Sequence, residues 1–239
     1  MPEPAVPVTA YAGSRVPAPR LPALGFDGQP LAVGGKSGQL TLVNLWATWC
    51  LPCLGELKDL AAHHDELKKA GLRIVALSVD GLTEGGAAGD PAALAAKLKL
   101  PFECGRATPS LARRVEKLRS TGWGIKWPLP VPASLLLDGE GRLIALYYGP
   151  VSADRLLADL PRAALAQQPG ALPSLPDMAA QLHLPVRTVR ARLSQQRSSY
   201  QLLLDEERAR RAQQALADGE LPVKAIAESL GFQDGSNFS

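Results

Sequence analysis

The fold of this chain is decided by Leu40-Thr-Leu-Val-Asn-Leu-Trp-Ala-Thr-Trp-Cys50-Leu-Pro-Cys53. The first half of this stretch is a continuous, mostly apolar run, which is typical of a strand buried at the centre of a sheet. Helical spacing follows over residues 52–70, where apolar side chains recur on one face until Gly71 ends the helix. The sequence therefore places a Cys-x-x-Cys pair at the junction of a central strand and a helix.

The two cysteines of this junction have the spacing that thiol–disulfide exchange requires. Two intervening residues put both sulfur atoms in the first helical turn, beside unpaired backbone N–H groups and the positive end of the helix dipole. Those groups stabilise a thiolate, and such sites have pKa values of roughly 3.5–7.5 against about 8.5 for a free thiol. We therefore predict that Cys50 is the attacking thiol and that Cys53 is the more buried thiol that resolves the mixed disulfide.

The same pair could instead be half of a zinc site. The remaining candidate ligands would be Cys104, the third cysteine of the chain, with His63 and His64. Neighbouring histidines point in different directions on a helix, and the sequence holds no second Cys-x-x-Cys motif. The strand before the pair and the tryptophans beside it favour redox chemistry, so we expect a redox-active disulfide and no metal.

The elements around the pair predict an α/β domain with a mixed sheet. They are a strand at 72–79, helices at 91–99 and 109–119, a β-hairpin of 134–138 with 142–148, and a helix at 152–166. Residues 1–39 contain seven prolines and six glycines. That composition predicts an extended lead-in before the domain.

Residues 40–165 resemble the thioredoxin-like redoxins of the TlpA/ResA type. The resemblance rests on the stretch from Val43 to Cys53, on Glu56, on Val131-Pro132, and on Leu135-Leu-Leu-Asp-Gly-Glu-Gly-Arg142. It implies that the Val131–Pro132 bond is cis and lies beside the cysteines, where Trp49, Val131 and Pro132 would contact the substrate. It also implies that Glu56 tunes the proton affinity of the pair. The family usually has a proline shortly after the Glu56 position, where this chain has Leu57-Lys58.

The sequence shows no recognisable targeting signal or membrane-spanning segment. It has 239 residues with a net charge of +3, which is too small to predict a nucleic-acid partner by itself. No apolar run reaches the length of a membrane span, and no secretory signal is visible at the N-terminus. The TlpA/ResA-type family is usually periplasmic or membrane-anchored, whereas this sequence leads us to expect a cytoplasmic protein.

Residues 174–239 carry a second pattern, that of a helix-turn-helix. Helices are expected near 175–182, 186–196, 199–217 and 222–230, after a proline-rich linker at 167–173. On the second helix Arg187, Arg190 and Ala191 share the side opposite the apolar stripe. Two outward guanidinium groups suit guanine edges or phosphates of double-stranded DNA, and Arg192 with Arg197 could hold the backbone. The region has eight basic and eight acidic residues, so its overall charge does not favour DNA.

This region resembles the AraC-type DNA-binding domain. The resemblance rests on segments 174–182, 185–193, 200–208 and 221–232, with Ser236 and Phe238. It implies that Arg187, Arg190 and Ala191 occupy base-facing positions, although Ala191 stands where the family usually has arginine. The sequence stops at Ser239, where the second recognition helix of the family should begin, so we expect an incomplete C-terminal domain and compromised two-unit binding.

Together these patterns predict four segments. They are a lead-in at 1–39, a thioredoxin-like domain at 40–166, a linker at 167–173 and a small all-α helix-turn-helix domain at 174–239. The first hypothesis is a thiol–disulfide oxidoreductase, acting on a disulfide-bearing protein or thiol substrate, joined to a DNA-binding module. The alternatives are a redox-responsive transcription regulator whose sensor is the cysteine pair, and a fusion in which only the first domain works.

Overall fold

The structure of the chain is a computed structural model. It describes residues 8–17, 21–33, 38–82, 89–123, 131–168, 170–219, 222, 224–226 and 230. The chain divides into two compact units, Met1–Leu156 and Leu157–Ser239. Each unit is described by itself.

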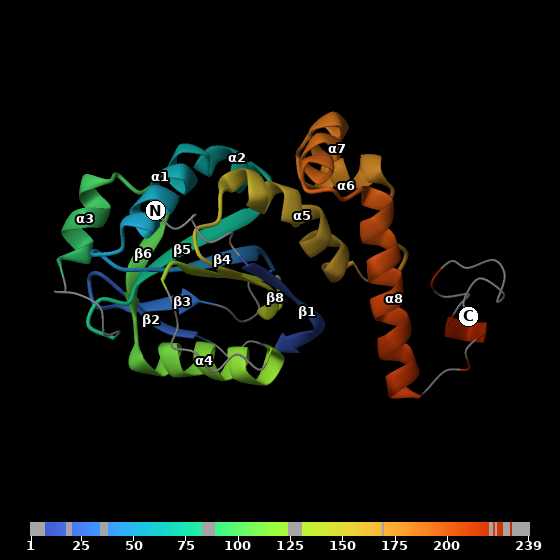
Figure 1. The fold of residues 1–239 in the computed structure, drawn as a ribbon, viewed down its shortest axis with the longest axis horizontal. Coiled ribbons are helices and arrows are strands. Elements are labelled where there is room, and N and C mark those ends of the chain that lie inside the picture. Colours follow the sequence, from blue (N-terminus) through green and yellow to red (C-terminus); the bar gives the residue numbers. More distant parts are fainter. Residues whose placement is uncertain are drawn as a thin grey trace, which may run out of the picture. The chain divides into compact units, whose positions relative to one another are not determined.

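The first unit is built on one mixed sheet of eight strands in the order β1-β8-β7-β4-β5-β6-β2-β3 (Figure 1). Strands β4, β5 and β6 run parallel to one another, and the remaining neighbours pair antiparallel. In chain order the strands are β1 (Val8–Pro17), β2 (Leu21–Gly25), β3 (Pro30–Val33), β4 (Leu40–Trp46), β5 (Leu72–Ser78), β6 (Glu103–Ala107), β7 (Ala133–Leu137) and β8 (Arg142–Tyr148).

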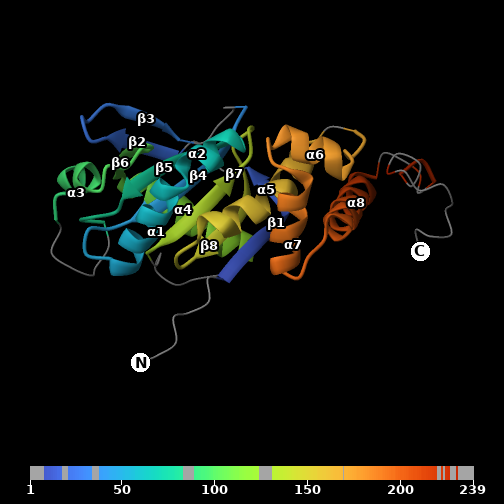
Figure 2. The same ribbon diagram turned by 90° about the horizontal axis from the view of Figure 1, so that it is seen from above.

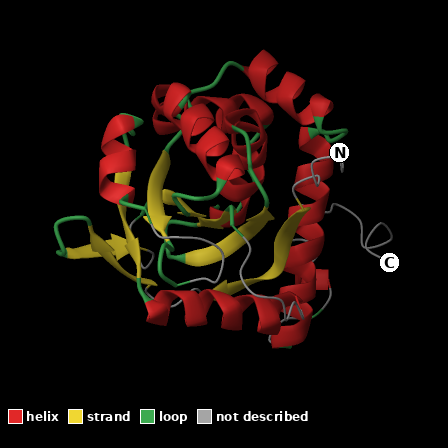
Figure 3. Ribbon diagram, turned by 60° about the vertical axis from the view of Figure 1, so that its left-hand side comes forward, coloured by secondary structure: helices red, strands yellow, loops and turns green. Residues whose placement is uncertain are grey.

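Helices cover both faces of this sheet (Figure 3). They are α1 (Leu51–Ala62), α2 (His64–Lys69), α3 (Pro91–Lys97) and α4 (Pro109–Trp123). A further helix, α5 (Ala153–Gln167), begins in this unit and ends in the second. All seven residues of β4 are buried, because this strand lies mid-sheet with helices on either side. Cys53 and Leu57 of α1 join Leu111 and Val115 of α4 in one hydrophobic cluster with the strands. The predicted thioredoxin-like fold is thus confirmed.

Residues 8–33 correct the expectation of a lead-in that precedes the domain. Within this range, residues 8–17, 21–25 and 30–33 form three strands of the sheet, with β1 paired to β8 and β2 lying between β6 and β3. Their prolines argued against strands in the sequence, but these prolines occupy positions at which a strand can accept proline. Pro17 ends β1, Pro30 begins the edge strand β3, and Pro22 lies outside the three residue pairs that join β2 to β6. The sheet therefore begins well before residue 40.

Two further differences concern elements inside the domain. The helix predicted at 52–70 is divided at His63 into α1 and α2. Strand β6 was not predicted, because only two of its five residues, Cys104 and Ala107, have apolar side chains. It joins the sheet by pairing with β5 and β2. For the other predicted strands and helices, most observed ends lie within two residues of the predicted ones. The exception is α4, which continues to Trp123.

The second unit contains α6 (Leu175–Gln181), α7 (Val186–Gln195) and α8 (Tyr200–Asp218) (Figure 2). The Ser174 hydroxyl caps α6 and the Ser199 hydroxyl caps α8, each accepting a backbone N–H. His183 has a φ of 51° in the turn between α6 and α7. The buried stripe is formed by Met178, Ala179, Leu182, Val189 and Leu193.

The boundary between the units falls within α5, earlier than the predicted linker at 167–173. Of the helix expected at 222–230, only 222, 224–226 and 230 are described, and Ser236 and Phe238 lie outside the described residues. No helix in the described part of the chain combines the length and hydropathy that a membrane crossing requires.

Candidate active site at the Cys50–Cys53 disulfide

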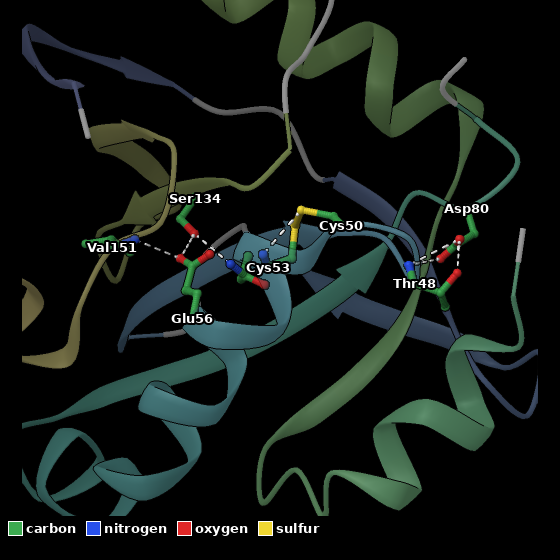
Figure 4. The surroundings of a disulfide bond; sticks show 8 residues. Thr48, Cys50, Cys53, Glu56, Asp80, Ser134 and Val151 are labelled. Atoms are coloured by element: carbon green, nitrogen blue, oxygen red, sulfur yellow. Dashed lines mark hydrogen bonds between the residues drawn. A yellow bond between two sulfur atoms is a disulfide. The ribbon is translucent and has the colours of Figure 1, made fainter. Parts of the chain in front are cut away.

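The cysteine pair forms a disulfide at the N-terminus of α1. Cys50 has an extended backbone and caps the helix, and its Sγ accepts the Cys53 N–H at 3.2 Å (Figure 4). Pro52 follows in the first turn, where its lack of an N–H costs no helical hydrogen bond. Cys50 is 4% exposed and Cys53 is 0% exposed. The sulfur at position 50 therefore lies at the polarised end of the helix, as the sequence predicted.

The loop before Cys50 is held by Asp80, which sequence analysis missed. The Asp80 carboxylate accepts the Thr48 N–H at 3.2 and 3.0 Å and the Thr48 hydroxyl at 2.7 Å. It also accepts the Ser78 hydroxyl at 2.6 Å, and the Thr48 Oγ1 in turn accepts the Gly89 N–H at 2.9 Å. The available signal was an acidic residue just past the end of β5, the parallel neighbour of β4.

Glu56 is buried one turn beyond Cys53 on α1, and it is 4% exposed. Its Oε1 accepts the Val151 N–H at 3.2 Å and the Ser134 hydroxyl at 3.3 Å. Burial raises the pKa of Glu56 from 4.5 to about 8, although the Val151 N–H, the Asn44 amide and the Ser134 hydroxyl act in the opposite direction. A carboxyl with this pKa is mostly protonated at neutral pH and can both give and take a proton.

The second carboxylate of α1 contacts the beginning of α5. Asp59 Oδ2 accepts the Ala153 N–H at 2.7 Å, two residues after the Val151 N–H that Glu56 accepts. Both acceptors thus come from the helix that carries the cysteines.

The predicted substrate contacts surround the same cluster. The Val131–Pro132 bond is cis, as the resemblance implied. Pro132 is buried and its carbonyl accepts the Gly149 N–H at 2.9 Å. Trp49 and Val131 are half-buried and pack against the hydrophobic cluster that includes both cysteines. Leu51, which lies between the cysteines in sequence, is 79% exposed and was not singled out by the sequence.

The candidate zinc ligands have other contacts. Cys104 is half-buried in β6, its thiol donates to the Phe102 carbonyl, and burial raises its pKa to about 11. His63 pairs with Asp59, and the ring of His64 lies against Phe102. Across the described residues, no three or more His, Cys, Asp or Glu side chains are gathered in a way that could hold a metal ion.

In the second unit, the arginines of α7 and those of α8 differ in their contacts. Arg187, Arg190 and Ala191 are exposed on α7, and within the described residues neither arginine makes a hydrogen bond or an ion pair. Arg192 of the same helix is half-buried and does have a partner. The arginines of α8 are engaged: Arg208 with Asp205, and both Arg210 and Arg211 with Glu207.

Comparisons with known proteins match the first unit to redox proteins. Residues 13–148 match the AhpC/TSA family. The thiol:disulfide interchange protein HelX of Rhodobacter capsulatus is 28% identical over 146 residues, which cover 61% of this chain and 73% of HelX. The thiol-disulfide oxidoreductase ResA of Bacillus thuringiensis is 24% identical over 139 residues, which cover 58% of this chain and 72% of ResA.

The C-terminal part is similar to a different protein. The ornithine utilization regulator of Pseudomonas aeruginosa is 43% identical over 77 residues, which cover 32% of this chain and 23% of that regulator. The two resemblances predicted from the sequence are therefore confirmed, each for its own part of the chain.

Proposed function

Because the chain belongs to the AhpC/TSA family and is a thiol–disulfide oxidoreductase, we propose that it exchanges electrons with disulfide-bearing proteins through Cys50 and Cys53. The observation that carries this proposal is the place of the Cys50 sulfur at the N-terminus of α1, within 3.2 Å of the Cys53 N–H. The same backbone group would stabilise a thiolate when the disulfide is open.

The proposed cycle begins with the reduced pair. The Cys50 thiolate attacks one sulfur of the substrate disulfide, forming a mixed disulfide and releasing the other substrate sulfur as a thiolate. The Cys53 thiol then loses its proton and attacks the Cys50 sulfur. This second attack closes the Cys50–Cys53 disulfide and releases the remaining substrate thiolate. The substrate disulfide has gained two electrons and the cysteine pair has lost two.

The neighbouring residues take supporting roles in this proposal. Glu56 in its ionised form receives the proton of Cys53, since it lies one helical turn away and its pKa of about 8 is close to that of a thiol. Pro132 presents its backbone region to the substrate chain, and Trp49 and Val131 supply the apolar contacts next to the cysteines.

Insulin reduction by dithiothreitol tests the cycle. The protein should accelerate the precipitation of reduced insulin chains, and Cys50→Ser should abolish the acceleration because no attacking thiol remains. Cys104→Ser is the matched control and should retain the activity, since that thiol is half-buried with a raised pKa. Equal activity of Cys50→Ser and the unaltered protein would overturn the proposal.

A second candidate function is redox-responsive DNA binding. It is supported by the contrast between Arg187 and Arg190, which are exposed and have no partner among the described residues, and the paired arginines of α8. In this proposal Arg187 and Arg190 read base edges together with Ala191, and Arg192 contacts the phosphate backbone. The cysteine pair is then the sensor. This candidate requires a cytoplasmic location.

Binding to a random-sequence duplex DNA pool tests this candidate. Anisotropy should show binding that weakens with salt and differs between oxidised and reduced protein. Arg187→Ala and Arg190→Ala should each weaken binding, whereas Arg208→Ala, whose arginine is paired with Asp205, should not. If all three variants bind like the unaltered protein, the DNA-reading role is wrong. If oxidised and reduced protein bind DNA equally, the DNA-binding role stands and the sensor role of the cysteine pair is wrong.

A further inference from the structure

Two polar side chains lie unexpectedly in the middle of the sheet. Asn44 on β4 and Ser134 on β7 stand opposite each other in the strand register, and both are completely buried. Every other residue of β7 is apolar, and β4 is apolar around Asn44. Burying an amide and a hydroxyl is unfavourable unless they are hydrogen-bonded, so the pair calls for an explanation.

These side chains form a series of hydrogen bonds that ends on Glu56. Figure 4 labels its last two members, Ser134 and Glu56. The Asn44 Nδ2 donates to the Ser134 Oγ at 3.0 Å. Because this bond occupies an acceptor position of the hydroxyl, the single hydroxyl proton is left to donate to Glu56 Oε1, at 3.3 Å. The series therefore delivers one donor to the carboxyl that lies a turn beyond Cys53.

This series of hydrogen bonds leaves one oxygen of the Glu56 carboxyl without a donor. Glu56 Oε2 and Asn44 Oδ1 are buried and accept no hydrogen bond from the described residues. Oε1 is held by two donors, Ser134 and Val151, whereas Oε2 has none. This asymmetry fixes the orientation of the carboxyl and makes Oε2 the oxygen that carries the exchangeable proton.

We propose that Asn44 and Ser134 are positioning residues of the exchange reaction, which hold Glu56 in the orientation from which it exchanges a proton with Cys53. This inference rests on the proposed cycle at Cys50 and Cys53. The hydrogen bond from Ser134 stabilises the carboxylate form of Glu56, so its loss leaves a more basic carboxyl that is ionised only at higher pH. Attack by Cys53 should then require a higher pH.

Few other ionisable groups face this carboxyl. Asp59 acts on it from the same helix, and Cys50 and Cys53 lie one to two turns before it. Strands β4 and β7 contribute no ionisable side chain, and Asp154 in the first turn of α5 acts on His63. Substitution of Asn44 or Ser134 therefore changes the hydrogen bonds around Glu56 without changing any charge near it.

Single-turnover reaction with Ellman's reagent separates the two steps of the cycle. Attack by Cys50 on the reagent forms a mixed disulfide and releases one thionitrobenzoate, and attack by Cys53 on that mixed disulfide releases the second. The rate of each phase is measured against pH. In Ser134→Ala we expect the midpoint of the second phase to move to higher pH, with about a tenfold lower rate per pH unit of movement on the rising limb, while the first phase is unchanged.

Matched variants decide whether the effect is specific. Ser134→Thr keeps the hydroxyl and should restore the midpoint. Thr41→Val removes another buried hydroxyl from β4, one that bonds to the Gln39 carbonyl, and should leave both phases unchanged. Asn44→Ala removes the first donor of the series and should move the midpoint in the same direction as Ser134→Ala, which covers the case in which one variant fails to fold.

The outcomes are distinguishable. If the unaltered protein releases no second thionitrobenzoate, the proposed cycle itself is wrong. If it releases both but Ser134→Ala and Asn44→Ala retain its pH profile, or if Thr41→Val shifts the profile equally, the positioning role is overturned and the cycle stands.

Discussion

At the scale of single residues, the site depends on where two carboxylates are placed. Asp80 is bound by Thr48 and Ser78, and it fixes the backbone two residues before Cys50. Glu56 is buried behind the disulfide and has a pKa of about 8. Asp80 holds the loop through the groups that donate to it, and Glu56 is kept largely protonated by burial, so the first serves structure and the second proton transfer.

Glu56→Gln should change how stability depends on pH. The folded-state pKa of about 8 exceeds the ordinary value of 4.5, so the folded protein binds a proton that the unfolded chain releases between these values. Stability of the unaltered protein should therefore fall as pH rises through this window, by up to about 1.4 kcal/mol per pH unit. Glu56→Gln lacks this loss and should be relatively more stable above pH 8, in urea unfolding of the oxidised protein.

The control for this measurement is Glu116→Gln, which neutralises an exposed carboxylate on α4. Its unfolding free energy should follow that of the unaltered protein at every pH. A Glu56→Gln curve parallel to the unaltered one would mean that the buried carboxyl does not titrate in this range.

The residue scale also shows what the sequence could reveal about the site. Cys50 and Cys53 belong to one local motif, and their place at the start of a helix followed from the rules of helix termini. Glu56 and Pro132 entered only through a resemblance. Asp80 was missed because its partner is 32 positions away in sequence and is reached through the pairing of β4 with β5.

At the scale of elements, the N-terminal strands matter most for the sheet. Strand β1 pairs with β8 from Val8↔Tyr148 to Pro17↔Arg142 and so covers an edge that would otherwise be open. Strands β2 and β3 extend the opposite side beyond β6. The long apolar strands and the helices with clear periodicity were predictable. Strands β1 to β3 and β6 were not, because proline, glycine and charged residues interrupt their patterns and their pairing is long-range.

Deletion of residues 1–17 should destabilise the first unit. It removes β1 and leaves the backbone groups of β8 unpaired at an open edge, which favours association between molecules. We expect a lower urea midpoint and concentration-dependent oligomers in size-exclusion chromatography. Deletion of residues 1–7 leaves β1 intact and is the control. Identical behaviour of the two deletions would show that β1 contributes little to the stability of the sheet.

At the scale of the whole molecule, the chain combines two units with different cores. The first is organised around the mixed sheet, and the second contains a helical stripe that includes Met178 and Leu193. The sequence revealed both units because each carries its own pattern. The position of their boundary was less predictable, since α5 runs through it without a break in helical periodicity.

Met178→Ala should separate the two units by their stability. This side chain is fully buried in α6, and its truncation should lower the unfolding free energy of the helical unit by about 2–5 kcal/mol. Insulin reduction by the first unit should be retained. Gln213→Ala, an exposed position of α8, is the control and should change neither property. Loss of exchange activity in Met178→Ala in proportion to its stability would contradict this separation.

The hydrogen bonds from Val151 to Glu56 and from Ala153 to Asp59 have a practical consequence. Amide resonances shift when the charge of the oxygen they point at changes, so these two backbone protons form a built-in pair of spectroscopic reporters. In isotope-labelled protein, the Val151 signal should follow the titration of Glu56. The protonation state of the Glu56 carboxyl could then be followed through a redox cycle without labelling the cysteines.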